Sequence, residues 1–169
     1  MMGGDAKKVR EIRPDLVSMV SGGDLTGAYA LLEATIGNLD VRGWGWPFEP
    51  TADLMRRIMV ICPGQQGVEL AVEALCGHAI YGPGLNIWKQ ARYEQDLESW
   101  RQTSFIVGVQ WGALDWSCDA GKQKAGCYRL ADAPPFLTPD CWMEEEGGGC
   151  CCGWLELMEG NEPPTPWRK

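Results

Sequence analysis

Cysteine is the residue type in this chain with the greatest capacity for chemistry. The chain has 169 residues and eight cysteines, six of which lie between residues 111 and 152. These six are Cys118, Cys127, Cys141, Cys150, Cys151 and Cys152. The surrounding stretch is rich in glycine and proline and buries little aliphatic surface, so burial alone does not offset the entropy of ordering it. We therefore expect covalent or metal cross-links to hold this segment together.

The spacing of these cysteines is compatible with more than one kind of cross-link. It contains no Cys-x-x-Cys pair, the strong signature of a zinc ribbon or knuckle. A zinc site with four thiolates remains open, because the cysteines could converge in space. The predicted metal ligands are Cys118, Cys127, Cys141, Cys150 and Cys152. Disulfides fit the even number of cysteines equally well, and unlinked thiols are the third alternative.

A cysteine-dependent hydrolase is the enzymatic alternative. It would pair the single histidine, His78, with a thiol and a positioning carboxylate, for example Cys118 and Asp115. A lone histidine at a helix end is more typical of a cap or a surface group. The three acids at 144–146 precede three glycines, a pattern typical of a solvated hairpin tip, and no phosphate-binding loop is present. We assign no catalytic or cofactor-binding residue.

Helical periodicity precedes the cysteine-rich segment. The pattern predicts helices over residues 14–21, 25–36, 52–61, 65–79 and 85–102. Residues 104–111 form a run of β-branched and aromatic residues that predicts one strand. Cys62 and Cys76 lie within helical patterns and are interpreted as small buried hydrophobic residues. The predicted fold class is α+β and mainly helical: a small helical body, one or two strands and a cysteine-rich loop module.

The predicted organisation has three parts. Residues 1–110 form the helical body and include a solvated N-terminal tail, residues 111–155 form the cysteine-rich module, and residues 156–169 form an extended, Pro-rich C-terminal tail. Within the body, residues 38–50 contain aromatic residues between small ones and a proline. This stretch is interpreted as a loop held to its own core by aromatic anchors, with an aromatic docking surface as the alternative.

Charge and hydropathy narrow the classes of partner. The formal net charge is −8, and broad binding to a phosphate backbone needs clustered lysine and arginine, so contact with nucleic acid is not indicated. No window reaches the roughly 18 consecutive apolar residues of a membrane span. The basic residues at the start are followed by no apolar core, so no secretory signal is predicted. The remaining expectation is a protein partner.

A set of short motifs between residues 88 and 143 resembles a known family. The residues that carry it are, in order, Ala91-Arg92, Glu94, Trp111, Asp115, Cys118, Gly126, Tyr128, Leu130, Asp132, Pro134-Pro135, Pro139 and Cys141. This order is similar to the C-terminal domain of phage minor head proteins of the Mu F-like type. That family carries an ART-E helix, a strand, and a loop of the form W…LD…CxxC…GxxYxLxxxPPxxHPxCRC. Here PPFLTPDC is similar to PPxxHPxC, and LDWSC to the segment before the first cysteine.

The chain departs from the family pattern at three places. Gly121 stands where the family has its second cysteine, Thr138 stands at the histidine, and Cys141-Trp142-Met143 replaces CRC. If a metal is bound, Cys127 and the cysteines at 150–152 must supply the missing ligands. The resemblance implies a structural role in capsid assembly or genome delivery.

The expected function is therefore that of a structural assembly protein, most specifically a phage virion or head-morphogenesis component. Its expected partners are other virion subunits, its expected location is the virion or the host cytoplasm, and its expected metal is zinc. The alternatives are the hydrolase that uses His78 and a disulfide-rich interaction protein of an oxidising compartment.

Overall fold

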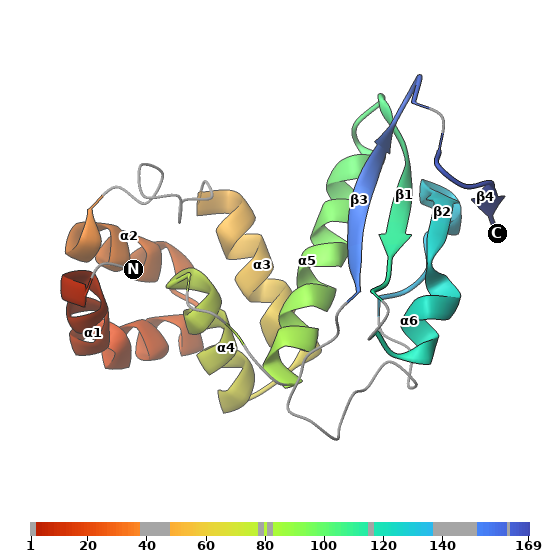
Figure 1. The fold of residues 1–169 in the computed structure, drawn as a ribbon. Coiled ribbons are helices and arrows are strands. Elements are labelled where there is room, and N and C mark those ends of the chain that lie inside the picture. Colours follow the sequence, from red (N-terminus) through yellow and green to blue (C-terminus); the bar gives the residue numbers. More distant parts are fainter. Residues whose placement is uncertain are drawn as a thin grey trace. The chain divides into compact units, whose positions relative to one another are not determined.

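The computed structural model describes residues 3–37, 48–77, 80, 83–114, 117–136, 152–161 and 163–169. The chain divides into two compact units, Met1–Ile80 and Tyr81–Lys169, and each is described by itself. The first unit is helical in the described residues, and the second combines helices with a sheet (Figure 1). The predicted class, α+β and mainly helical, is confirmed.

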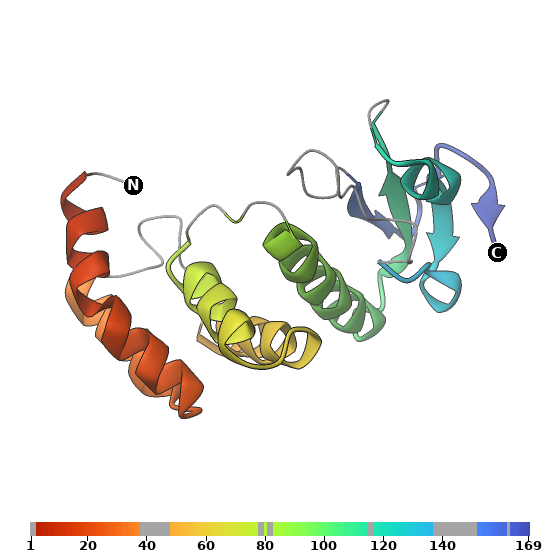
Figure 2. The same cartoon turned by 90° about the horizontal axis from the view of Figure 1, so that it is seen from below.

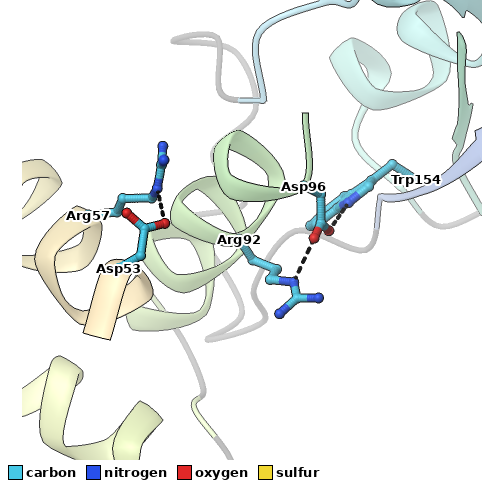
Figure 3. Close-up of polar contacts among 5 residues, drawn as sticks. All are labelled: Asp53, Arg57, Arg92, Asp96 and Trp154. Carbon is cyan, nitrogen blue, oxygen red and sulfur yellow. Dashed lines mark hydrogen bonds and ion pairs between the residues drawn. The ribbon is translucent and has the colours of Figure 1, made fainter. Parts of the chain in front are cut away.

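Four helices make up the described part of the first unit. They are α1 (Gly3–Ser21), α2 (Leu25–Ile36), α3 (Phe48–Ile61) and α4 (Gln65–Leu75). Helix α1 packs against α2 and α4, and α3 packs against α4. Their shared core consists of aliphatic side chains that recur at helical spacing, with Leu32, Met55 and Val72 fully buried. Arg57 and Asp53, one turn apart on α3, form an ion pair with 2.7 Å between nitrogen and oxygen (Figure 3).

Local sequence signals predicted the bounds of α2 correctly. Asp24 accepts a hydrogen bond of 2.9 Å from the backbone N–H of Gly27 and so caps the helix. The predicted apolar stripe is the buried face. The helix ends at Gly37, whose φ of 85° lies in the left-handed region that favours glycine.

Helix α1 is longer than predicted. The sequence was interpreted as a solvated tail before Pro14, but the helix begins at Gly3 and contains Pro14 in its interior. Val9, Leu16 and Val20 are all almost completely buried and lie on one face across the proline. Burial of this face against α2 and α4 offsets the backbone hydrogen bond that proline cannot donate. The tail prediction was therefore wrong for these residues.

The second unit is built on a sheet with the strand order β3-β1-β2-β4 in the described residues. Its elements are α5 (Pro83–Arg101), β1 (Ile106–Gly112), α6 (Asp119–Lys124), β2 (Gly126–Arg129), the 3-10 helix η2 (Leu130–Asp132), β3 (Gly153–Met158) and β4 (Trp167–Arg168). Strand β1 pairs antiparallel with β2 and β3, and β4 pairs parallel with β2. The sequence predicted one or two strands, and the sheet has four among the residues that the structure describes.

Helix α5 belongs to the sheet unit. It lies along one face of the sheet in both views (Figures 1 and 2), and its Tyr93 and Leu97 share a buried cluster with Val109 and Trp111 of β1. The predicted boundary after residue 110 separated this helix from the cysteine-rich module. The contacts instead divide the chain between residues 80 and 81, because the apolar stripe of α5 is buried by aromatic residues from that module.

The C-terminal residues, predicted to be an extended tail, complete the sheet. Strand β4 follows the prolines and pairs with β2. A Cβ added at Gly108 would overlap the ring of Trp167, so this ring lies directly over β1. The guanidinium of Arg129 stacks 4.9 Å from the centre of the same ring. The contacts of Trp167 with β1 and Arg129, together with the pairing of β4 with β2, place this segment on the sheet.

Candidate functional site

An aromatic cluster joins α5 to described residues of the cysteine-rich module. Tyr93 of α5 meets Trp111 of β1 edge to face at 5.1 Å and Trp154 of β3 at the same distance. Phe136 lies 5.5 Å from Trp111 and 5.3 Å from Trp154. Edge-to-face pairs of this kind stabilise a core beyond the area that they bury. These rings replace the aliphatic residues that the segment lacks.

Tyr93 also fixes the loop after η2 through its hydroxyl group. The Tyr93 hydroxyl donates a hydrogen bond of 2.9 Å to the carbonyl oxygen of Pro134. Burial raises the pKa of the Tyr93 phenol well above its usual value, and nearby Arg101 opposes the shift only weakly. The phenol is therefore protonated at physiological pH and acts as a permanent donor.

Asp96 connects α5 to the start of β3. Its carboxylate lies between Arg92, 3.0 Å away on the same helix, and the indole N–H of Trp154, which donates a hydrogen bond of 2.9 Å (Figure 3). Both members of the ion pair are less than one-fifth exposed. The carboxylate therefore positions Trp154, and with it the residue two places earlier, Cys152.

Basic side chains hold the backbone around the cysteines. Lys89 of α5 donates a hydrogen bond of 2.9 Å to the carbonyl oxygen of Cys152. Lys124 of α6 donates to the carbonyl oxygens of Pro135 and Phe136 at 2.7 and 2.8 Å, while its ammonium group lies 5.3 Å from the Trp111 ring. These charge-assisted bonds go to carbonyl groups of residues that lie outside the helices and strands.

Two of the predicted metal ligands, Cys118 and Cys152, meet beside α6. Cys118 is the N-cap of α6, and its sulfur accepts a hydrogen bond of 3.4 Å from the backbone N–H of Gly121. Cys152, immediately before β3, is 1% exposed. A Cβ added at Gly121 would overlap Cys152 Sγ and lie 3.5 Å from Cys118 Sγ. The two sulfurs are therefore within about 6 Å of each other.

The absence of a side chain at Gly121 creates the space that Cys152 Sγ occupies. Gly121 is buried, and Cys152 Sγ lies where the first carbon of a side chain at this position would stand. A sulfur from the residue before β3 therefore lies next to Cys118.

Cys127 does not belong to this pair. In the register of β1 and β2, Cys127 is the partner of Gln110, while Tyr128 is the partner of Val109. Val109 and Tyr128 belong to the buried cluster on the α5 face, so alternation puts Cys127 on the opposite face. There its sulfur accepts a hydrogen bond of 3.3 Å from the Thr165 hydroxyl. Cys127 therefore does not fit a metal centre with Cys118 and Cys152.

The other predicted metal ligands, Cys141 and Cys150, lie outside the described residues, as does His78 of the hydrolase alternative. Within the described ranges, no group of three or more cysteine, histidine or acidic side chains is arranged to hold a metal ion. Cys118 and Cys152 fit half of a tetrahedral thiolate site. Completion of the site by Cys141 and Cys150 stays a prediction.

The two cysteines of the helical unit differ in environment. Cys76 is fully buried, as predicted, and burial together with the neighbouring carboxylate of Glu73 raises the pKa of its thiol to about 12. Cys62, after the end of α3, is partly exposed, so the prediction of a buried residue was wrong there. The carbonyl oxygen of Cys62 occupies the space beside Gly67 of α4, where a side chain would overlap it.

Sequence reasoning did not find Asp96, Lys89 or Lys124. Each acts on a backbone or indole group more than ten residues away in the chain, and no local pattern marks such a pairing. Trp154 gave a weak signal, because an isolated aromatic residue beside a cysteine cluster indicates a buried anchor.

Comparison of the chain with family models, with curated proteins and with solved structures finds no match. In the described part of the chain, no helix has both the length and the apolar character that a bilayer crossing requires.

Proposed function

We propose that this protein is a structural assembly protein, most specifically a phage virion or head-morphogenesis component. In this proposal, the unit at residues 81–169 is a docking module. The observation that carries the proposal is the order and packing of its elements. A helix with Ala91, Arg92 and Glu94, then strand β1, then the cysteine-rich segment form one compact unit. The Mu F-like resemblance implies these elements in this order.

The exposed edge of the sheet favours the proposal that the partner is another protein. Strand β3 is an edge strand in the described sheet, and Leu155 and Met158 on it are 64% and 42% exposed. Phe105, whose carbonyl oxygen accepts a hydrogen bond from the N–H of Glu159, is 54% exposed beside the end of β3. Apolar side chains on an open strand edge favour contact with another chain. Other virion subunits are the partners that this proposal assigns, in the virion or the host cytoplasm.

Purified particles provide the test of this function. Particles produced by a host that carries the gene are separated on a density gradient, and the chain is quantified against the major capsid protein by mass spectrometry. We expect a few copies per particle, and fewer for Cys118→Ser than for the matched Cys62→Ser control, because Cys62 lies in the other unit. Particles that contain none of the chain, and that form normally without its gene, would contradict the proposal.

The proposal includes a zinc ion as the cross-link of the reduced module. Zinc would be held by Cys118 and Cys152 together with Cys141 and Cys150, and it would supply a structural tie with no catalytic role. Elemental analysis of protein purified under reducing conditions should give about one zinc per chain, as expected for a four-thiolate site. Cys118→Ser and Cys152→Ser should lose the metal. Cys127→Ser should retain it, because Cys127 lies on the other face of the sheet. A reduced protein without zinc would refute this part of the proposal.

A further inference from the structure

The Cys118 and Cys152 thiols differ in accessibility although they lie close together. Cys118 is partly exposed at the start of α6, whereas Cys152 is 1% exposed within the aromatic cluster. Their sulfurs are within about 6 Å of each other, and the structure holds both as thiols. A disulfide needs sulfurs about 2 Å apart and Cβ atoms about 4 Å apart. Side-chain rotation brings the two sulfurs together, and any change needed in the Cβ separation comes from a backbone movement.

We infer that Cys118 is a modification site for low-molecular-weight disulfides such as oxidised glutathione, and that Cys152 resolves the adduct into a Cys118–Cys152 disulfide. In the first step, the Cys118 thiolate attacks one sulfur of the small disulfide, forms a mixed disulfide and releases one thiolate. In the second step, the Cys152 thiolate attacks Cys118 Sγ and displaces the second thiolate. Two protein thiols are oxidised and one small disulfide is reduced to two thiols. Where zinc is bound by the same sulfurs, closure of the bond releases the ion.

The order of the two steps follows from exposure. A small disulfide reaches the partly exposed Cys118 but not the buried Cys152, which reacts only with a sulfur already beside it. Gly121 allows the second step, because its missing side chain gives Cys152 Sγ its place beside Cys118. The disulfide would tie the start of α6 to the start of β3, which are far apart in sequence. This inference rests on the proposed cross-linked module and not on its presence in a virion.

Peptide mapping tests the inference on the full chain. Protein reduced and then freed of reductant is incubated with oxidised glutathione, and unreduced tryptic peptides are analysed by mass spectrometry at several times. In the wild type, glutathione should first appear on the peptide 102–122, which contains Cys118. This peptide should then become linked to the peptide 130–168. Buried Cys76, whose thiol pKa is about 12, should remain unmodified and serves as the internal control.

Two serine variants separate the roles of the sulfurs. Cys152→Ser should accumulate the glutathione adduct at Cys118 and lose the link, whereas Cys118→Ser should show neither. Cys127→Ser is the matched control and should behave as the wild type. Near-ultraviolet circular dichroism checks that each variant keeps its aromatic packing, and the time order of adduct and link in the wild type does not depend on any variant.

Two results would overturn the inference. One is a link to the peptide 130–168 that persists in Cys152→Ser, which would mean that another cysteine resolves the adduct. The other is modification of Cys118 that is no faster than modification of Cys76. Either result leaves the particle test untouched, and the absence of the chain from particles leaves this chemistry untouched, so the two failures are distinguishable.

Discussion

Replacement of Trp111 by alanine is expected to lower the free energy of unfolding of the unit at residues 81–169 by about 3–5 kcal/mol. Trp111 is 1% exposed and is the largest of the fully buried side chains in the described residues. Its ring contacts those of Tyr93, Phe136 and Trp154, so its removal leaves a cavity where three elements meet. The unit has few aliphatic residues that could collapse into such a cavity.

A second variant distinguishes the contribution of the Trp111 ring from that of its indole N–H group, and a surface variant is the control. In the described structure, the buried Trp111 indole N–H has no hydrogen-bond partner. Trp111→Phe therefore loses contact area but no hydrogen bond, and we expect a smaller loss of about 1–2 kcal/mol. Phe105→Ala is the surface control, because Phe105 is 54% exposed, and its effect should stay within about 0.5 kcal/mol.

Urea denaturation followed by hydrogen exchange with mass spectrometry is the suitable measurement, because it reports on each unit separately. Protection should fall in peptides from residues 81–169 in Trp111→Ala and remain in peptides from α1 to α4. A loss as small as that of Phe105→Ala would show that the aromatic cluster does not carry the stability of the unit.

The parts of the fold that the sequence could predict are those specified by local signals. Helix α2 has a capping aspartate, an apolar stripe and a terminal glycine, and its predicted bounds agree with the structure. Helix α5 and strand β1 were also placed within two residues of their observed ends. In contrast, α1 was shortened because Pro14 is typical of a helix start, whereas the observed helix continues through it and buries Val9 together with Leu16 and Val20.

The parts of the fold that the sequence could not predict depend on pairing between segments that are distant in the chain. Strands β2, β3 and β4 are short, and each is stabilised by a partner that is distant in the chain or beyond a turn. The face on which Cys127 lies depends on its register opposite Gln110, and a shift of one residue would turn it toward α5. Composition identified the cysteines as the unusual feature of the chain. It could not indicate that Cys118 and Cys152 come together while Cys127 points away.

Gly121 has a structural role in this unit, because Cys152 Sγ fills the space that its missing side chain leaves. The size of residue 121 and the presence of the Cys152 sulfur must therefore be energetically coupled. Residues in direct contact show coupling free energies of about 0.5–3 kcal/mol, whereas residues that do not touch contribute additively.

Gly121→Ala is therefore expected to destabilise the unit by about 1–3 kcal/mol, because the added methyl group overlaps Cys152 Sγ. In a Cys152→Ala background the sulfur is gone, and the remaining neighbours, Cys118 Sγ and Ser117 Cβ, lie at 3.5 and 3.7 Å, an ordinary contact distance. There the same substitution should stabilise the unit by about 0.5–1 kcal/mol, since alanine is preferred to glycine inside a helix. The sign of the effect thus depends on the sulfur.

A double-mutant cycle in urea, measured under reducing conditions, gives this coupling directly. Gly112→Ala is the matched control, because a Cβ there meets nothing closer than 3.9 Å, and its effect should be the same with and without Cys152. Reducing conditions exclude any disulfide and a metal chelator removes any zinc, so a coupling at residue 121 then reports packing alone. Additive effects at residues 121 and 152 would mean that the two sulfurs do not share the space beside Gly121. The zinc site and the disulfide proposed for Cys118 and Cys152 would then lose their common geometric basis.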